Sequence, residues 1–182
     1  MQIEETSLES VKIIKPAVHG DDRGFFMECW NQAVFEKSGL SLNFVQDNHS
    51  RSSRGVLRGL HYQIQQAQGK LVRVTRGEVF DVAVDMRRSS AQFGQWFGTV
   101  LSESNKQQLW VPPGFAHGFY VLSEFADFQY KCTEYYAPEH ERCLLWNDPQ
   151  IGIEWPIKAG LSPQLAAKDV AGKRFDECES YR

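Results

Sequence analysis

The feature that most constrains the fold of this chain is that no convincing helical pattern occurs between residues 40 and 160. Short segments rich in Val, Phe, Tyr and Trp follow one another there, separated by clusters of Gly, Pro, Asn and Ser, and this spacing is typical of β-strands. Residues 79–86 carry apolar side chains at the even positions, with Asp81 and Asp85 among the odd ones. One apolar face and one mixed face suit a strand of a sandwich or barrel.

Helical signals occur only near the two ends of the chain. Asn31 can cap a short helix that ends at Gly39, because Asn is a favoured N-cap and Gly commonly follows a helix. Ser162, followed by a proline, predicts a second helix that ends near residue 167. The 182 residues are expected to form one domain, an all-β double sheet or jelly roll with short terminal helices and a C-terminal tail over residues 162–182.

The charge balance argues against nucleic acid as a partner. The chain has 20 Lys and Arg and 23 Asp and Glu, which gives a net charge of −3. A protein that binds nucleic-acid duplexes usually carries an excess of basic residues. No apolar stretch approaches the roughly 20 residues of a membrane helix, so no membrane partner is expected. The first ten residues hold three Glu and no basic residue, so we expect no targeting signal and a cytoplasmic location. The four cysteines lack C-x-x-C spacing and are predicted to be reduced thiols without a catalytic role.

Two histidines stand in unusual surroundings. His61 follows Leu-Arg-Gly-Leu in a strand-like segment, and His117 follows Pro-Pro-Gly-Phe-Ala. A lone His in an apolar strand is more often a core residue than a catalyst. Arg58 and His61 differ in parity, so a regular strand would send them to opposite faces. A bulge at Gly59 would turn both toward one cavity, and this is our hypothesis.

The spacing around these histidines does not favour a metal site. Segment 112–117, PPGFAH, resembles the second short motif of the cupin superfamily, a small barrel also called a double-stranded β-helix. The first cupin motif normally offers His-x-His and a nearby Glu, but here His61 is followed by Gln63, and residues 64–68 hold no carboxylate. Two imidazoles and amide side chains are a poor set for a divalent metal. We therefore expect no metal.

His61 is the best candidate for a general base, because no P-loop, Gly-rich dinucleotide turn or G-x-S-x-G elbow occurs. An unperturbed imidazole titrates near neutral pH. Such a base usually needs an acid to orient it. Asp81, Asp85 and the distant Asp169 are all candidates, and spacing does not choose among them.

Eight motifs follow one another over nearly the whole chain, from about residue 3 to residue 175. They are the segments 21–28, 44–50, 56–61, 68–73, 77–85, 113–119, 130–136 and 146–149. In content and order they strongly resemble the dTDP-4-dehydrorhamnose 3,5-epimerases. One departure occurs in segment 165–169, LAAKD, which lacks the serine usual in that family while keeping the Lys and the Asp.

The resemblance implies a fold, a reaction and an assembly. The fold would be a cupin-like jelly-roll barrel. The substrate would be a dTDP-4-keto-6-deoxyhexose, with dTDP-4-dehydro-6-deoxy-D-glucose converted to dTDP-4-dehydro-L-rhamnose in dTDP-L-rhamnose biosynthesis. Neither a cofactor nor a metal would be needed, because both inverted carbons are α to a ketone. In this family the N-terminal strands exchange between two subunits, so a homodimer is expected.

The resemblance also assigns four catalytic positions. His61 is implied as the base and Asp169 as the residue that orients it and stabilises the imidazolium. Tyr130 is implied as the acid that returns a proton from the other side, since a phenol with a pKa near 10 is protonated at neutral pH. Lys70 is implied to meet the C4 oxygen, where negative charge develops.

Further positions are implied to bind substrate. They are Arg23, Glu28, Gln46, Asp47, Asn48, Arg58, His117, Tyr136, Glu141 and Lys168. Arg23 and Arg58 would clamp the diphosphate with a planar bidentate fork, and Tyr136 would stack on thymine. With exchanged strands, Arg23 and Glu28 would serve the neighbouring subunit's site.

Other interpretations stay open. On periodicity alone, Tyr130 and Tyr136 would share one face of a strand over residues 126–136 and be core aromatics. Lys70 could protect a strand edge. A related enzyme that inverts a single carbon of a dTDP-4-keto-6-deoxysugar is the main alternative. A metal-dependent cupin oxygenase and a non-catalytic sugar-binding barrel are the others.

Overall fold

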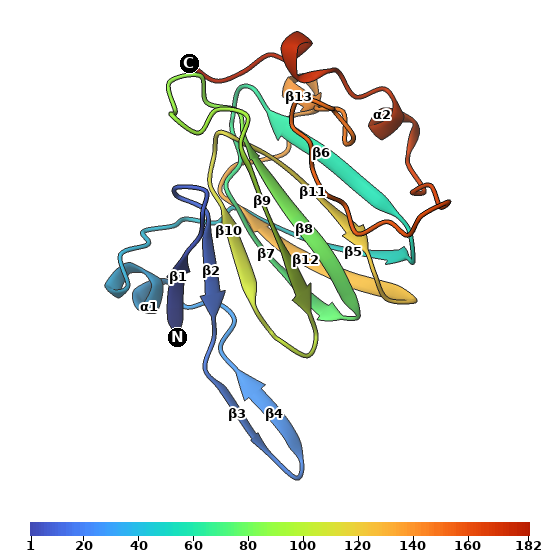
Figure 1. The fold of residues 1–182 in the computed structure, drawn as a ribbon. Helices are drawn as coiled ribbons and strands as arrows, with labels where there is room; N and C mark the ends of the chain where they lie inside the picture. Colours follow the sequence, from blue (N-terminus) through green and yellow to red (C-terminus); the bar gives the residue numbers. More distant parts are fainter.

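Two antiparallel sheets make up the body of the computed structural model, which describes all 182 residues (Figure 1). The first sheet has the order β1 (Gln2–Glu5), β2 (Lys12–Lys15), β10 (Gln108–Val111), β7 (Lys70–Arg76), β12 (Phe125–Cys132) and β5 (Gln46–Ser53). The second has the order β13 (Glu141–Cys143), β6 (Leu57–Gln63), β11 (Phe115–Val121), β8 (Glu78–Asp85) and β9 (Trp96–Ser102). These two packed sheets are the predicted jelly roll.

A two-stranded hairpin stands apart from both sheets. Its strands, β3 (Val18–Asp21) and β4 (Gly24–Met27), pair only with each other, and the hairpin extends away from the body below β2 in Figure 1. Phe25 is 61% exposed and Phe26 is 70% exposed. Two neighbouring large apolar side chains at this exposure are unusual for a surface with no partner.

Strand β8 explains how the core is divided. Its odd-numbered side chains, including Val79 and Ala83, belong to a cluster that both sheets contribute to. Its even-numbered side chains, including Val82 and Val84, pack on the other face of the second sheet against Leu144, Ile151, Phe175 and Cys178. The predicted mixed face of this strand therefore points between the sheets, and the C-terminal segment covers the wholly apolar face.

The first predicted helix is confirmed. Helix α1 (Gln32–Lys37) begins at Asn31, whose side chain accepts a hydrogen bond from Val34 N at 3.3 Å. It ends before Gly39, which has a φ of 86° and thus the left-handed conformation that commonly follows a helix.

The second predicted helix is wrong. Helix α2 is Ala167–Val170, and Ser162 lies outside any element. The backbone before α2 pairs instead with the start of β6: Gln164 N donates to Gly55 O at 2.7 Å, and Leu57 N donates to Gln164 O at 3.0 Å. This parallel bridge takes the hydrogen bonds that a helix from Ser162 would need. Two 3-10 turns, Pro138–His140 and Phe175–Glu177, complete the structure.

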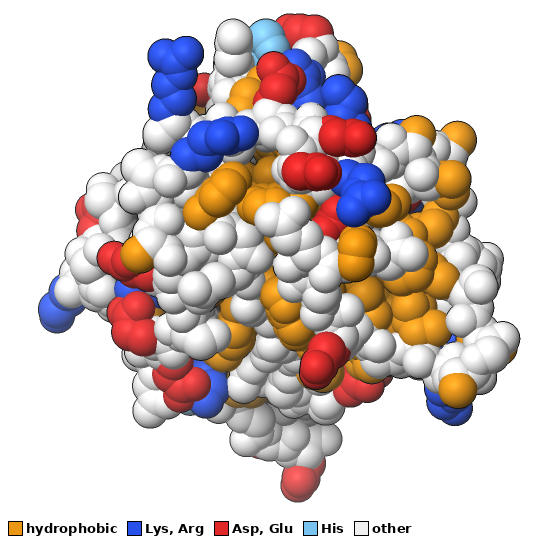
Figure 2. Space-filling view, turned by 45° about the horizontal axis from the view of Figure 1, so that its top comes forward, with side chains coloured by type: hydrophobic (Ala, Val, Ile, Leu, Met, Phe, Trp, Pro, Cys, Tyr) orange, Lys and Arg blue, Asp and Glu red, His pale blue; other side chains and the backbone are white.

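The predicted strand over residues 126–136 is shorter than expected, because β12 ends at Cys132. Tyr130 lies on the strand and Tyr136 in the loop after it. Neither α-helix has the length and apolar character needed to cross a bilayer. On the face drawn in Figure 2, acidic and basic side chains are interspersed rather than gathered by sign.

Candidate active site

One cavity, of about 340 Å³, opens between the two sheets beside β13 and α2. Side chains from β5, β7 and β12 of the first sheet face side chains from β6 and β11 of the second. The predicted site residues that line it are Gln46, Asn48, Arg58, His61, Lys70, His117, Tyr130, Tyr136, Glu141, Lys168 and Asp169. Residues spread over more than a hundred positions of sequence thus converge on one space large enough for a small ligand.

A bulge in β6 brings Arg58 and His61 to the same cavity, as hypothesised. His117 on β11 pairs with His61, while Phe119, two residues on, pairs with Arg58 three residues back. The extra residue on β6 reverses the parity of the strand. Gly59 has a φ of +128°, and a Cβ there would lie 2.6 Å from the Cα of Gly118. Only glycine fits this position.

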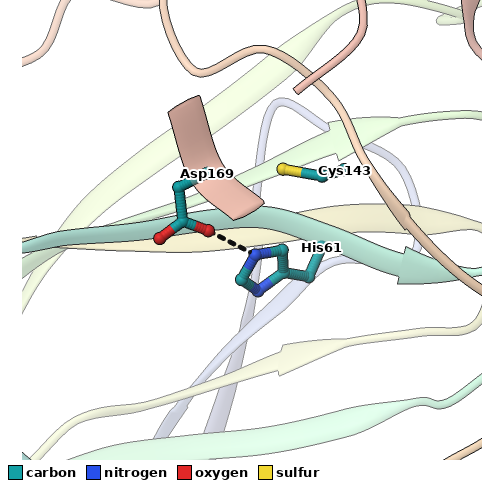
Figure 3. Close-up of side chains that lie close together, drawn as sticks. All are labelled: His61, Cys143 and Asp169. Carbon is teal, nitrogen blue, oxygen red and sulfur yellow. Dashed lines mark hydrogen bonds and ion pairs between the residues drawn. The ribbon is translucent and has the colours of Figure 1, made fainter. Parts of the chain in front are cut away.

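His61 is held by a carboxylate from the C-terminal helix. Its Nε2 lies 2.6 Å from Oδ1 of Asp169. Burial by itself would raise the pKa of Asp169. The hydrogen bond and charge of His61, together with backbone hydrogen bonds from Ala166 and Gly59, outweigh burial and hold that pKa below its usual value. An ionised acceptor keeps the proton on Nε2, and the free nitrogen, Nδ1, points away from Asp169 (Figure 3). Of the three candidate acids, Asp169 is the partner, since Asp85 pairs with Arg87 and Asp81 with His117.

A second histidine–aspartate pair lies deeper between the sheets. His117 Nε2 is 2.9 Å from Oδ1 of Asp81, and Asp81 is 0% exposed. Burial raises the pKa of Asp81, against the opposing influence of His117 and Lys70. The other carboxylate oxygen, Oδ2, is buried without a hydrogen-bond partner.

Tyr130 and Lys70 face the histidines from the first sheet. Their strands are adjacent: Tyr130 on β12 pairs with Val72, and Cys132 pairs with Lys70. Burial raises the pKa of the Tyr130 phenol, so the phenol is protonated at neutral pH. Burial lowers the pKa of Lys70, while the charges of Glu141 and Asp81 partly oppose the change. A protonated phenol and the Lys70 amine therefore stand across the cavity from His61.

The mouth of the cavity is built from a small polar network. Lys168 Nζ donates to both carboxylate oxygens of Glu141, at 3.0 and 3.2 Å. The Tyr136 hydroxyl donates to Glu141 Oε2 at 3.2 Å, and Tyr136 N donates to Gln46 Oε1 at 2.9 Å. Tyr136 is exposed, so its ring can receive a flat ligand group at the entrance. Since Lys168 precedes Asp169 on α2, one short helix contributes both to the mouth and to the histidine pair.

Comparison with known proteins identifies the family of this chain. The family model described as dTDP-4-dehydrorhamnose 3,5-epimerase matches residues 5–177. This chain belongs to that family. A curated dTDP-4-dehydrorhamnose 3,5-epimerase from Pseudomonas aeruginosa is 58% identical over 182 residues, covering 100% of this chain and 99% of the relative.

Solved structures of related epimerases share the fold. The dTDP-6-deoxy-D-glucose-3,5-epimerase of Legionella pneumophila, solved with dTDP-4-keto-L-rhamnose, has a TM-score of 0.94 and 54% identity, and the match covers 98% of this chain and 94% of that one. A 3'-monoepimerase from Streptomyces bikiniensis, solved with dTDP-quinovose, has a TM-score of 0.87 and 31% identity over 94% of this chain and 86% of that one.

Three positions that the epimerase resemblance implied lie outside the cavity of this chain. Arg23 is at the turn of the exposed hairpin and pairs with Asp21. Glu28 follows the hairpin and accepts a hydrogen bond from Asn31. Asp47 alternates with Gln46 and Asn48 on β5, so it points to the opposite face, where it pairs with Lys131 at 2.6 Å.

Several cavity residues were missed at the level of sequence. Ser50 lines the cavity, and its parity with Gln46 and Asn48 could have revealed it. For Gln63 the sequence predicts only that its amide is a poor metal ligand. Its amide instead accepts from Ala137 N at 3.0 Å and donates to Tyr135 O at 3.2 Å. Gln63 thereby braces the loop that carries Tyr136, a long-range role with no local sequence signal.

Cys143 is a free cysteine, as predicted, but the sequence did not predict its position. It lies beside the His61–Asp169 pair, as Figure 3 shows. Burial and the charge of Asp169 raise the pKa of its thiol to about 12, so the side chain is a neutral thiol rather than a nucleophile at neutral pH.

Proposed function

We propose that this chain inverts C3 and C5 of dTDP-4-dehydro-6-deoxy-D-glucose to give dTDP-4-dehydro-L-rhamnose, with His61 and Tyr130 acting on opposite faces of the sugar. The chain is a nucleotide-sugar epimerase, an isomerase of dTDP-L-rhamnose biosynthesis. The observation that carries the residue assignment is that His61 and Tyr130 line one cavity from two different sheets. A hexose ring between them would meet a base on one side and an acid on the other.

The reaction needs only proton transfers. The C3 and C5 hydrogens are acidic because each is α to the C4 ketone. Nδ1 of His61 takes the proton, the C–H electron pair forms the enolate, and negative charge moves to the C4 oxygen. Tyr130 then donates its proton to the same carbon from the opposite face. The phenolate of Tyr130 regains a proton from solvent, and the His61 imidazolium releases its proton to solvent, which restores both groups for the second carbon. Asp169 stabilises the imidazolium formed in the first step.

Lys70 stabilises the enolate. Its ammonium group faces the cavity from the sheet that carries Tyr130. A preorganised donor aimed at a developing oxyanion contributes about 3–4 kcal/mol to transition-state stabilisation. Partial burial strengthens this effect, because fewer waters compete for the C4 oxygen.

The other cavity residues bind the nucleotide. Arg58, whose Nε donates to Ser52 Oγ at 2.9 Å, is held in place to take the diphosphate. Tyr136 stacks on the thymine ring. The remaining polar positions hold sugar and base hydroxyl or carbonyl groups: Gln46, Asn48, His117, Glu141 and Lys168.

The exposed hairpin supports a homodimer. Its exposed phenylalanines, Phe25 and Phe26 on β4, would be covered by a second copy. The exchange would carry Arg23 and Glu28 to the neighbouring cavity. Replacing both phenylalanines by serine is expected to yield monomers with weakened substrate binding, measured by light scattering and KM. A cytoplasmic location and the lack of a nucleic-acid or membrane partner stay predictions.

Exchange with heavy water tests the reaction. The product formed in D₂O is expected to carry one deuteron at C3 and one at C5, read by NMR. The alternative, an enzyme that inverts a single carbon, would introduce one. The identity of 58% with a curated 3,5-epimerase, against 31% with the 3'-monoepimerase, supports double inversion.

A further inference from the structure

The proposed catalytic histidine belongs to a cluster of three possible metal ligands. His61, Cys143 and Asp169 each offer one ligand atom, and these atoms all lie within 4.8 Å of one another. They come from three elements: β6, β13 and α2. His61 and Cys143 are paired across β6 and β13, so both side chains project from the same face of the sheet, and α2 places the carboxylate beside them (Figure 3).

The reaction proposed above uses two members of this cluster and leaves Cys143 without a role. The chemistry of the set is that of a zinc site, because imidazole nitrogen, thiolate sulfur and carboxylate oxygen are the ligands that Zn²⁺ prefers. Three protein ligands with a fourth position left to water are typical of open zinc sites. Cys143 and His61 are both half-buried, so an ion can reach them from solvent.

We propose that His61, Cys143 and Asp169 form an inhibitory Zn²⁺ site, in which the metal switches off the enzyme by occupying the Nε2 atom of the base. This inference rests on the proposed role of His61. The site is distinct from a catalytic metal site, since the ion blocks proton transfer rather than assisting it.

The inhibition follows from the tautomers of imidazole. Without metal, Nε2 carries the proton and donates a hydrogen bond to Asp169, and Nδ1 has the free lone pair. A neutral imidazole bound to zinc through Nε2 must carry its proton on Nδ1. The nitrogen that should remove the substrate proton is then already protonated. Binding also releases the Cys143 thiol proton to solvent, because the thiolate is the form that ligates.

Cys143 sets the selectivity of the site. A thiolate favours Zn²⁺ and similar borderline ions, whereas Mg²⁺ and Ca²⁺ prefer oxygen ligands. Mg²⁺ bound to the substrate diphosphate would therefore leave this cluster untouched. Removing the sulfur should separate zinc sensitivity from catalysis.

Cobalt binding to the substrate-free protein is the first test. Co²⁺ substitutes for Zn²⁺ and gives a near-ultraviolet charge-transfer absorption when a thiolate ligates it. We expect this band in the wild-type protein, its loss on addition of one equivalent of Zn²⁺, and its absence in Cys143→Ala. Cys29→Ser, which changes another half-buried thiol, is the matched control and should keep the band. A wild-type protein without the band, or a band that survives in Cys143→Ala, overturns the proposal.

Zinc inhibition is the second test. Cys143→Ala and the conservative Cys143→Ser should turn over substrate at the wild-type rate and need about tenfold or more Zn²⁺ for half-inhibition. Equal zinc sensitivity of wild type and both variants contradicts the site. The two tests also separate the proposals: a cobalt band in a protein that exchanges no substrate protons would count against the epimerase mechanism alone, and normal exchange without a band would count against the metal site alone.

Discussion

The two histidine–aspartate pairs of this protein have the same composition and different environments. His61 and His117 are direct cross-strand partners on β6 and β11, and each bonds an aspartate, at 2.6 and 2.9 Å. The His61 side chain is 20% exposed and the His117 side chain 7%. Asp169 lies on a separate helix, whereas Asp81 lies on β8, which is flanked by β11 and β9 within the second sheet.

These differences give the carboxylates opposite properties. In Asp169 the interaction with His61 and two backbone hydrogen bonds together outweigh burial, and the pKa falls. In Asp81 burial outweighs His117, and the pKa rises. An ionised partner with several hydrogen bonds fixes the tautomer of a base. A deeply buried carboxylate instead makes the stability of the fold depend on the histidine that is paired with it. We therefore propose a catalytic role for the His61–Asp169 pair and a large part in stability for the His117–Asp81 pair.

The largest expected effect comes from removing the base. His61→Asn should lower kcat by about 10⁴-fold, a typical upper contribution of a general base, with little change in KM. His117→Asn should lower kcat far less and act mainly on KM. Steady-state kinetics of the two variants, compared with wild type, give the changes in kcat and KM. Equal losses of kcat in the two variants would contradict the proposal that only the His61–Asp169 pair acts in proton transfer.

The next effect concerns the aspartates. Asp169→Asn should lower kcat by about 10³-fold without changing KM, because an amide can donate to Nε2 and leave the proton on Nδ1. Asp81→Asn should alter kcat little, since an amide oxygen still accepts from His117. A pH–rate profile accompanies the kinetics, and an unchanged profile in Asp169→Asn would refute its role as a positioning residue.

Stability should show the reverse order. His117→Ala leaves Asp81 buried and unpaired, which is expected to lower the free energy of unfolding by about 3–5 kcal/mol. His61→Ala should cost less, because Asp169 lies next to the cavity and water can replace the imidazole. Urea denaturation measures both. A larger loss in His61→Ala than in His117→Ala would contradict the burial argument.

The smallest expected effect is that the two aspartates change the free energy of unfolding in opposite directions as pH rises. Asp169 has a lowered pKa, so its interactions stabilise the fold above its ordinary value of about 3.9 and are lost as pH falls through the folded-state pKa. Asp81 has a raised pKa, so its burial penalty develops as pH rises from about 3.9 toward that raised value.

Thermal unfolding of the two asparagine variants and the wild type between about pH 3 and pH 6 checks these opposite pH dependences. Relative to wild type, Asp169→Asn should become less stable as pH rises, and Asp81→Asn should become more stable. Shifts in the same direction would show that the two carboxylates do not differ in the way the structure implies.

Sequence patterns predicted the strands and the first helix because those elements follow from local periodicity and capping. The bulge at Gly59 was also readable, since parity placed Arg58 and His61 on opposite faces and a glycine stood between them. The structure of the segment around Ser162 could not be predicted, because Gln164 pairs with the start of β6, about a hundred residues earlier in the chain. The choice of Asp169 over Asp81 came only from the family resemblance, as no local rule brings α2 to β6.

Proton exchange in Tyr130→Phe tests the central claim most directly. If His61 and Tyr130 act on opposite faces, this variant should still let His61 remove protons and return deuterons from D₂O to the same face. NMR should then show deuterium at C3 or C5 of recovered substrate with unchanged configuration, and almost no inverted product. Loss of all exchange, as expected for His61→Asn, or inversion at the wild-type rate would contradict the assignment.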